Sequence, residues 1–210
     1  MRAILVLVAT AGALQSAVPV EREPRHRLVF QNALVTVLDA ELPAGGATAY
    51  HTHEHDGVAV AILPGQLTIT ALGAKPVPVT VVAGGVSFAR GGYTHEGRNT
   101  GDTPIRFIDV EMRGPGPSER FDPEETVPHR TPIDNERVAV RRLVIPAGDS
   151  LPAHRHAGPL LEICVRGSTA PGTAGPASPG ASLWREDGRV PPRKNAGTSE
   201  IEIVEVEWKP

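Results

Sequence analysis

Apolar and polar residues alternate along much of the chain, and glycine or proline interrupts the pattern at close intervals. Alternation over about four to eight residues is typical of half-buried strands, and no segment sustains a helical period. The segments with a strand pattern are residues 27–42, 58–65, 66–72, 77–85, 105–112, 137–146, 160–165 and 200–208. The sequence therefore predicts an all-β fold of many short strands, as in a sandwich or a barrel.

Two regions depart from this pattern. Residues 1–17 begin with Met-Arg, continue as an uncharged apolar run and end in small residues, which is the order of a secretory signal peptide. The run is shorter than the roughly 20 apolar residues of a membrane-spanning helix, although a buried N-terminal strand or helix is an alternative. Residues 114–136 are rich in proline and charge and predict a linker between residues 26–113 and residues 137–210. We therefore expect an exported protein that is cleaved near Ala17 and folds as two units.

The two units repeat one another. Residues 51–53 and 154–156 are both His-x-His, and each follows a Pro-Ala-Gly tripeptide after five further residues. Residues 84–99 and 180–195 have the same length, and each begins with a glycine and ends with an asparagine that opens a turn. A repeat of this kind indicates one duplicated supersecondary unit, and it predicts two barrels in tandem.

Histidines carry the candidate chemistry. Residues i and i+2 of a strand face the same side, so His51 and His53 project together, and His95 completes a ligand set if the barrel closes. Three neutral imidazoles suit a divalent transition metal (iron, zinc, manganese, nickel or copper) and leave positions open for water or substrate. His55 continues the alternation and is either a fourth ligand or an exposed loop residue.

These positions resemble the two motifs of the cupins. The first motif is matched by Gly45, His51, His53 and Gly65, and the second by Gly84, Gly92, His95 and Asn99. Arg90 stands where the second motif has a proline. The resemblance implies two small double-stranded β-helix (jelly-roll) barrels and a metal held by the histidines. Cupins with three-histidine sites include iron dioxygenases, so the resemblance is also compatible with enzymatic chemistry.

The chain departs from the cupin pattern at several ligands. Val58, with Gly57 beside it, stands where the first motif carries a glutamate. In the second unit that position is Leu160, Glu162 two residues on could substitute for it, and Pro191 replaces the third histidine. We therefore expect the C-terminal barrel to be degenerate and without its metal site, and any chemistry to belong to the N-terminal barrel.

The remaining residues have simpler interpretations. We expect His154 and His156 to be remnants without metal, His26 and His129 to be solvated, and Cys164 to be a small buried side chain. The acidic residues of the last segment predict a solvent-facing edge: Glu200, Glu202, Glu205 and Glu207.

Composition narrows the partners. Aromatic residues are 4% of the chain and the net charge is −3, which argues against binding of nucleic acid. The single cysteine excludes an intramolecular disulfide framework and a multi-cysteine zinc site. We expect a small-molecule ligand or substrate and no membrane partner for the mature chain, and the resemblance is compatible with a homodimer. Two functions stay open: a dioxygenase-like small-molecule metalloenzyme, and a non-catalytic cupin that binds a small ligand or has a structural role.

Overall fold

The computed structural model describes residues 16–124, 127–168 and 175–210, and strands dominate all three ranges. The 3₁₀ turn η1 (Val20–Arg22) lies near the start. Among the residues described, no helix is long and apolar enough to cross a membrane. The expected signal peptide falls on residues 1–15, outside the described ranges, and on Ser16 and Ala17, so it stays a prediction.

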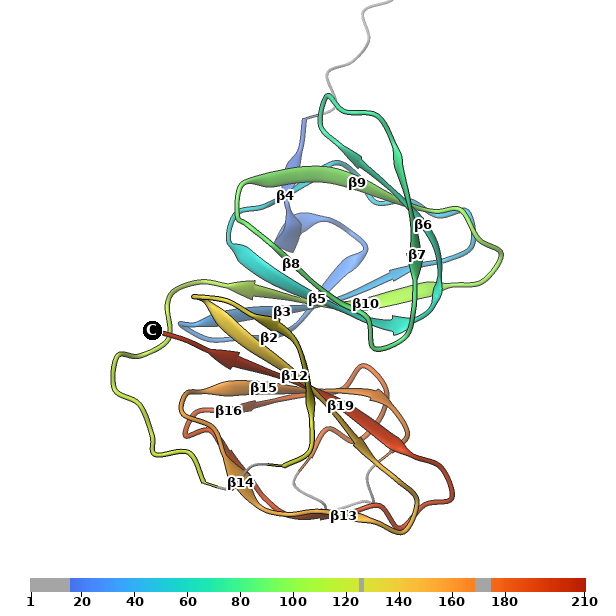
Figure 1. Ribbon diagram of the computed structural model, residues 1–210. Coiled ribbons are helices and arrows are strands. Elements are labelled where there is room, and N and C mark those ends of the chain that lie inside the picture. Colours follow the sequence, from blue (N-terminus) through green and yellow to red (C-terminus); the bar gives the residue numbers. More distant parts are fainter. Residues whose placement is uncertain (1–15, 125–126, 169–174) are drawn as a thin grey trace, which may run out of the picture.

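The N-terminal barrel consists of two five-stranded sheets, ordered β1-β4-β9-β6-β7 and β2-β3-β10-β5-β8 (Figure 1). Its strands are β1 (Val18–Pro19), β2 (His26–Gln31), β3 (Val35–Leu42), β4 (His51–His53), β5 (Asp56–Leu63), β6 (Gly65–Ala71), β7 (Val77–Val81), β8 (Val86–Ala89), β9 (Tyr93–Asn99) and β10 (Ile105–Met112). Inward-pointing apolar residues of both sheets form its core: Leu42, Ala61, Leu67, Val81 and Ile105.

The C-terminal barrel repeats this plan with one complete sheet, β11-β12-β19-β15-β16, and two short pairs, β13-β18 and β14-β17. Its strands are β11 (Arg130–Asp134), β12 (Val138–Ile145), β13 (Ser150–Leu151), β14 (His154–Arg155), β15 (Leu160–Arg166), β16 (Ser182–Arg185), β17 (Arg189–Val190), β18 (Arg193–Lys194) and β19 (Ile201–Trp208). The two short pairs stand in place of a second large sheet. The predicted all-β tandem of two barrels is confirmed, with less strand pairing in the second barrel.

An apolar layer joins the barrels where strands β3, β10 and β5 face strands β12, β19 and β15 (Figure 1). The layer takes alternate residues of its central strands: Ile108, Val110 and Met112 from β10, and Val204, Val206 and Trp208 from β19. The residues in between, including Asp109 and Glu111, point into their own barrel, because successive side chains of a strand face opposite sides. Both faces of β10 and β19 are therefore covered by protein.

This arrangement contradicts one prediction from the sequence. The alternating glutamates of the last strand do not face solvent, since Glu202, Glu205 and Glu207 are only 1%, 0% and 3% exposed. Glu205 and Glu207 lie on the face of β19 opposite the apolar layer and point into their own barrel. Glu202 lies on the same face as Val204 and Val206, and there it is covered by the other barrel near Gly84 and bound by Arg142 and Arg166. Only Glu200, just before the strand, lies at the surface.

The same asparagine turn closes each barrel and confirms the internal repeat. The side-chain amide of Asn99 donates to the carbonyl oxygens of Leu42 and Thr103 at 3.0 and 2.8 Å. The amide of Asn195 donates to the carbonyl oxygens of Ile145 and Ser199, both at 2.8 Å. In each turn the Oδ1 atom accepts the backbone N–H two residues later at 3.0 Å.

One boundary differs from the sequence pattern, and the predicted break at Pro64-Gly65 is confirmed. The segment 27–42 is divided into β2 and β3, because the Asn32 side chain accepts the backbone N–H groups of Leu34 and Val35 and turns the chain. The Pro64-Gly65 break separates β5 and β6, which belong to different sheets. A side chain at Gly65 would meet Ile105, since a Cβ there would lie 2.3 Å from its Cγ2 atom.

Residues outside the expected barrel limits also take part in the sheets. β1 precedes residue 26 and pairs with β4 in parallel. β11 lies inside the expected linker, residues 114–136, and pairs with β12. Sequence composition did not indicate either strand, because β1 is only two residues long and proline and charge surround β11.

Replacing Ile108 by alanine should lower the free energy of unfolding by about 2–5 kcal/mol, because the change leaves a cavity in the apolar layer. Val144→Ala is the matched control, since Val144 is 45% exposed, and it should change stability by less than about 0.5 kcal/mol. Urea unfolding followed by circular dichroism measures both. Equal effects of the two substitutions would contradict the importance of the layer.

Candidate metal centre

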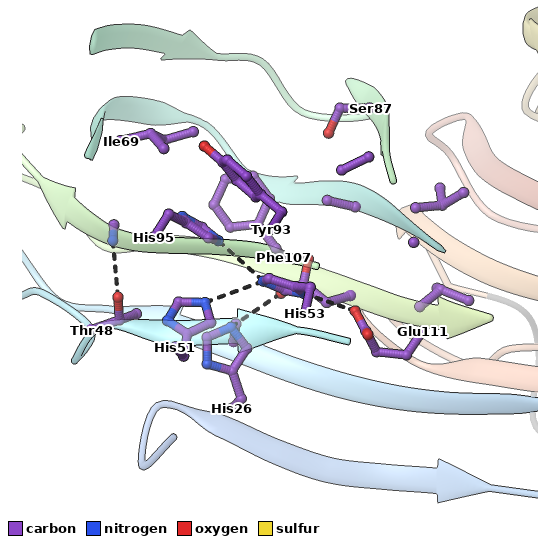
Figure 2. Close-up of a pocket in the computed structure, with 18 of the residues that line it drawn as sticks. His26, Thr48, His51, His53, Ile69, Ser87, Tyr93, His95, Phe107 and Glu111 are labelled. Atoms are coloured by element: carbon purple, nitrogen blue, oxygen red, sulfur yellow. Dashed lines mark hydrogen bonds and ion pairs between the residues drawn. The ribbon is translucent and has the colours of Figure 1, made fainter. Parts of the chain in front are cut away.

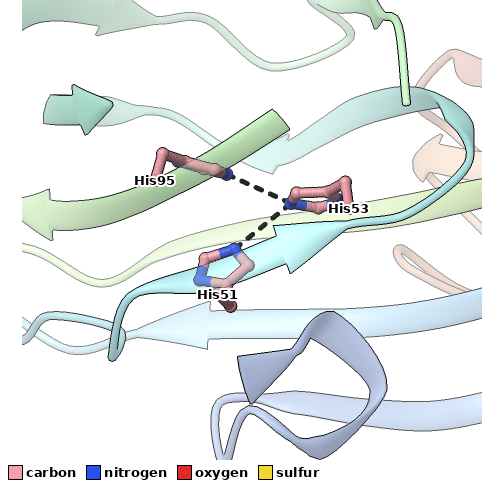
Figure 3. Close-up of side chains that lie close together, drawn as sticks. All are labelled: His51, His53 and His95. Carbon is pink, nitrogen blue, oxygen red and sulfur yellow. Dashed lines mark hydrogen bonds between the residues drawn. The ribbon is translucent and has the colours of Figure 1, made fainter. Parts of the chain in front are cut away.

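Three histidine side chains converge on one point inside the N-terminal barrel (Figure 3). His51 and His53 come from β4, and His95 lies opposite His51 on the antiparallel neighbour β9. The Nε2 atom of His53 is 3.2 Å from that of His51 and 3.1 Å from that of His95. The structure thus brings together all three residues that the sequence predicts as ligands.

In two of these rings the Nδ1 atom, which points away from the convergence point, hydrogen-bonds to an oxygen atom, and the Nε2 atom is left available as a ligand. His51 Nδ1 lies 2.9 Å from the carbonyl oxygen of Ala49, and His53 Nδ1 lies 2.7 Å from Glu111 Oε1. Both oxygens are acceptors, so each ring donates from Nδ1 and directs an Nε2 lone pair at the other ring. Two lone pairs that face each other across 3.2 Å repel unless a cation lies between them. Such outer contacts are typical of histidines that bind metals.

The separation of the nitrogens fits a single ion. Ligand nitrogens about 2.1 Å from one metal are roughly 3.0–3.4 Å apart for coordination angles between a right angle and a tetrahedral one. Burial lowers the pKa of His51 to about 4 and that of His95 to about 3, which keeps both rings neutral at pH 7. The residues present therefore fit a divalent transition metal.

The glutamate position of the first motif proves to be Gly57 rather than Val58. In the antiparallel register Gly57 pairs with Glu111, and Val58 pairs with Val110. Directly opposed residues point to the same side, so Val58 faces the apolar layer and Gly57 faces the histidines. A Cβ on Gly57 would lie 3.2 Å from Glu111 Oε1. The glycine thus leaves room for a carboxylate from the neighbouring strand, which supports His53 from behind.

His26 is a part of this site that the sequence did not reveal. It was expected to be solvated, but it is buried, and its ring centroid lies 4.7 Å from that of His51. Burial alone would lower the pKa of His26, but hydrogen bonds to Asp109 and Glu23 raise it to about 9. His26 lies 25 residues before the His-x-His motif, so no local spacing connects the two. The strand order that places β2 and η1 beside this site is a long-range property of the fold.

The charges around the three histidines suit a cation. The carboxylates of Glu23, Asp109 and Glu111 lie in this region with the single imidazolium of His26. Three carboxylates against one imidazolium leave two formal negative charges close to the three converging rings. A divalent ion at the three Nε2 atoms would balance them.

The histidines open onto a largely apolar pocket of about 220 Å³ (Figure 2). Tyr93 stacks on His95 with ring centroids 4.7 Å apart, and Ser87 supplies a hydroxyl group. His55 lies on the bend between β4 and β5 and lines the pocket, but it does not belong to the group of converging nitrogens. The apolar part of the lining is formed mainly by Leu67, Ile69, Val79, Val81 and Phe107.

A second histidine cluster lies in the C-terminal barrel. His154 and His156 converge with Glu205 of β19, and all three are buried. Burial alone would lower the pKa of His156, but hydrogen bonds with Glu205 and Glu207 raise it to about 9. Glu162 does not substitute here, because Arg185 and Arg193 bind its carboxylate elsewhere in the barrel. Cys164 is buried as expected, and burial raises the pKa of its thiol to about 11.

Comparison with known proteins agrees with this geometry. Residues 38–111 match the family described as Cupin domain, and this range contains His51, His53 and His95. None of the curated proteins compared with the chain matches it.

Several solved structures share the fold of the whole chain. AerE from Microcystis aeruginosa is 12% identical, with 90% of this chain and 99% of that chain covered at a TM-score of 0.61. Salicylate 1,2-dioxygenase from Pseudaminobacter salicylatoxidans is 11% identical, with 90% and 77% covered and a TM-score of 0.62. The Lactobacillus farciminis oxalate decarboxylase formate complex is 14% identical, with 85% and 78% covered and a TM-score of 0.55. At these identities the likeness establishes the fold alone.

Replacing Glu111 by glutamine should weaken metal binding in the N-terminal barrel about 10–100-fold, because the neutral amide supports His53 less well than a carboxylate does. Glu41→Gln, an exposed change on the neighbouring strand β3, is the control and should have no effect. Competition with a chromophoric chelator measures the affinity. The binding event that is missing in His95→Ala is the one that belongs to the N-terminal barrel. Unchanged affinity in Glu111→Gln would contradict the role of this carboxylate.

Proposed function

Since this chain is a member of the cupin superfamily built as a bicupin, we propose that its N-terminal barrel is a metal-dependent site for a small, largely apolar molecule. In this proposal His51, His53 and His95 hold one divalent transition metal ion. The reaction class that we favour is oxygenation of the dioxygenase type. The predicted signal peptide supports a further proposal, that the mature protein acts outside the cytoplasm.

One observation carries the proposal. Three Nε2 atoms lie 3.1–3.2 Å apart along the chain of contacts from His51 through His53 to His95, and the outer nitrogens of His51 and His53 are already used as donors. A metal ion between the facing nitrogens would remove the repulsion of their lone pairs, and the site opens onto a pocket. A closed structural site would have no such opening.

The chain's own residues define what the pocket can accept. A redox-active or Lewis-acidic ion would supply the activation of oxygen or of a substrate donor atom. Leu67, Ile69 and Phe107 exclude water and favour an apolar ligand body, and lysine and arginine are absent from the described lining. An anionic group of the ligand would therefore find its counter-charge at the ion, whereas Tyr93 and Ser87 could hydrogen-bond to neutral polar groups.

The similarity to salicylate 1,2-dioxygenase supports oxygenation as a candidate reaction, through the shared fold only. The alternative is a barrel that binds a small molecule without turnover. The largely apolar lining is compatible with this binding function, because it offers few groups for general acid–base chemistry: Asp109 and Glu111 contact histidines, and Tyr93 and His55 lie at the pocket wall. Both functions use the same metal site.

Elemental analysis of wild-type protein and His95→Ala tests the metal site. We expect His95→Ala to contain one transition-metal ion per chain fewer than the wild type, because a ligand nitrogen is lost. His55→Ala, which removes a pocket histidine outside the converging group, should retain the wild-type metal content. The metal site would be wrong if His95→Ala kept all of its metal.

Oxygen uptake then separates the two functions. Iron-loaded wild-type protein should consume oxygen when it is supplied with panels of small aromatic and dicarbonyl compounds, and His95→Ala should not. A wild-type protein that binds iron and shifts its melting temperature with such compounds, but consumes no oxygen, would favour the binding function.

A further inference from the structure

Buried glutamates in the C-terminal barrel follow a regular pairing, with one exception. Three of them each bind two arginine side chains: Glu162 binds Arg185 and Arg193, Glu202 binds Arg142 and Arg166, and Glu207 binds Arg120 and Arg141. Each carboxylate thus has permanent cations beside it, as a buried charge requires. Glu205, which is 0% exposed, is bound by His154 and His156 instead.

Among the residues that the structure describes, two imidazoles, and no arginine, contact the carboxylate of Glu205. His154 Nε2 lies 3.2 Å from Glu205 Oε1, and His156 Nε2 lies 3.0 Å from Glu205 Oε2. The Nδ1 atom of His154 lies 3.2 Å from the carbonyl oxygen of Pro152, to which it donates. The ring nitrogens of both histidines thus converge on one carboxylate, and the candidate ligand atoms of His154, His156 and Glu205 all lie within 4.8 Å of one another.

We propose that His154, His156 and Glu205 form a second binding site for a divalent transition metal. Two imidazoles and one carboxylate are a ligand set that suits iron, zinc or manganese. One of these ligands is itself negatively charged, whereas the three ligands of the N-terminal barrel are all imidazoles. The proposal stands independently of the function proposed for the N-terminal barrel.

The third ligand of this site comes from a different strand than in the first barrel. Pro191 stands where His95 would be repeated, so strand β9 has no ligating counterpart. Glu205 follows Asn195 by ten residues, as Asp109 follows Asn99, which makes the two acids equivalent positions of β19 and β10. The inward face of β19 thus supplies a third candidate ligand, Glu205, in place of the histidine that Pro191 replaces.

The two equivalent acids differ because their neighbouring histidines differ. Asp109 lies 3.3 Å from the Nε2 atom of His26, which supplies its positive partner. His129 occupies the position equivalent to His26, six residues before the capping Asn135 as His26 is before Asn32. Its Nδ1 atom instead hydrogen-bonds to the carbonyl oxygen of Val127 at 2.7 Å. Within the described ranges Glu205 therefore has no contact equivalent to that between Asp109 and His26, and it contacts His154 of β14 and His156, which follows that strand.

The surroundings give the site an outer contact and a path of entry. His156 Nδ1 lies 3.4 Å from Glu207 Oε2 and 3.0 Å from Arg141 Nη1, and Arg141 also binds Glu207. This carboxylate behind His156 corresponds to Glu111 behind His53 in the first barrel. An ion would enter through a cavity of about 280 Å³, which is lined by both His154 and His156 and also by four cationic side chains: Arg120, Arg141, Arg155 and Lys209.

Counting metal ions in variants tests the second site. The His95→Ala protein, which lacks a ligand of the first site, should bind about one cobalt or zinc ion per chain. Adding Glu205→Gln should abolish that ion or weaken its binding at least 100-fold. Adding Glu202→Gln instead, an equally buried glutamate on the same strand, should leave it bound. Cobalt absorption spectra and metal-dependent melting temperatures follow each protein.

The outcomes are distinct from those for the N-terminal barrel. A His95→Ala protein that binds no ion would overturn the second site, and would mean that a proton shared between the imidazoles neutralises Glu205. Equal ion binding by the Glu205→Gln and Glu202→Gln proteins would also overturn it. If Glu205→Gln does not fold, His154→Gln takes its place as the variant that removes a ligand, and the number of ions bound by His95→Ala still tests the second site.

Discussion

The apolar layer between the barrels determines where the charged residues of this protein lie. Strands β10 and β19 give one face to that layer, so their other face turns into a barrel, where most of its side chains are shielded from bulk water. Carboxylates on that inward face must find partners inside. In the first barrel they lie beside His26 and His53, and in the second they bind arginines and histidines. The chemistry of both barrel interiors thus follows from how the two sheets pack.

The sequence predicted what depends on local spacing. His51 and His53 share a face because a strand alternates, and the turn at Asn99 is set by its own side chain. It did not predict Glu111, His26 or Glu205, whose roles arise from strand pairing over long separations. Alternation separates two faces of a strand, but it does not say whether the polar face meets water or the interior. The glutamates of β19 were misread for that reason.

The two barrels show how one scaffold can hold different sets of polar groups. Both keep a His-x-His pair and a carboxylate behind its second histidine, Glu111 or Glu207. They differ in the inward acid of the last strand, which binds His26 in the first barrel and the His-x-His pair in the second. The equivalent histidine that precedes each barrel's capping asparagine also differs. His26 contacts Asp109 inside the first barrel, whereas His129 hydrogen-bonds to the backbone carbonyl of Val127.

The asparagine turn has a consequence for how the chain tolerates change. Asn99 and Asn195 tie together the ends of strands through backbone carbonyl groups, whose identity does not depend on any neighbouring side chain. Each clamp lies within its own barrel and hydrogen-bonds to no described residue of the other. Loss of one asparagine should therefore loosen the strand ends of that barrel alone, while the other barrel keeps its closing turn.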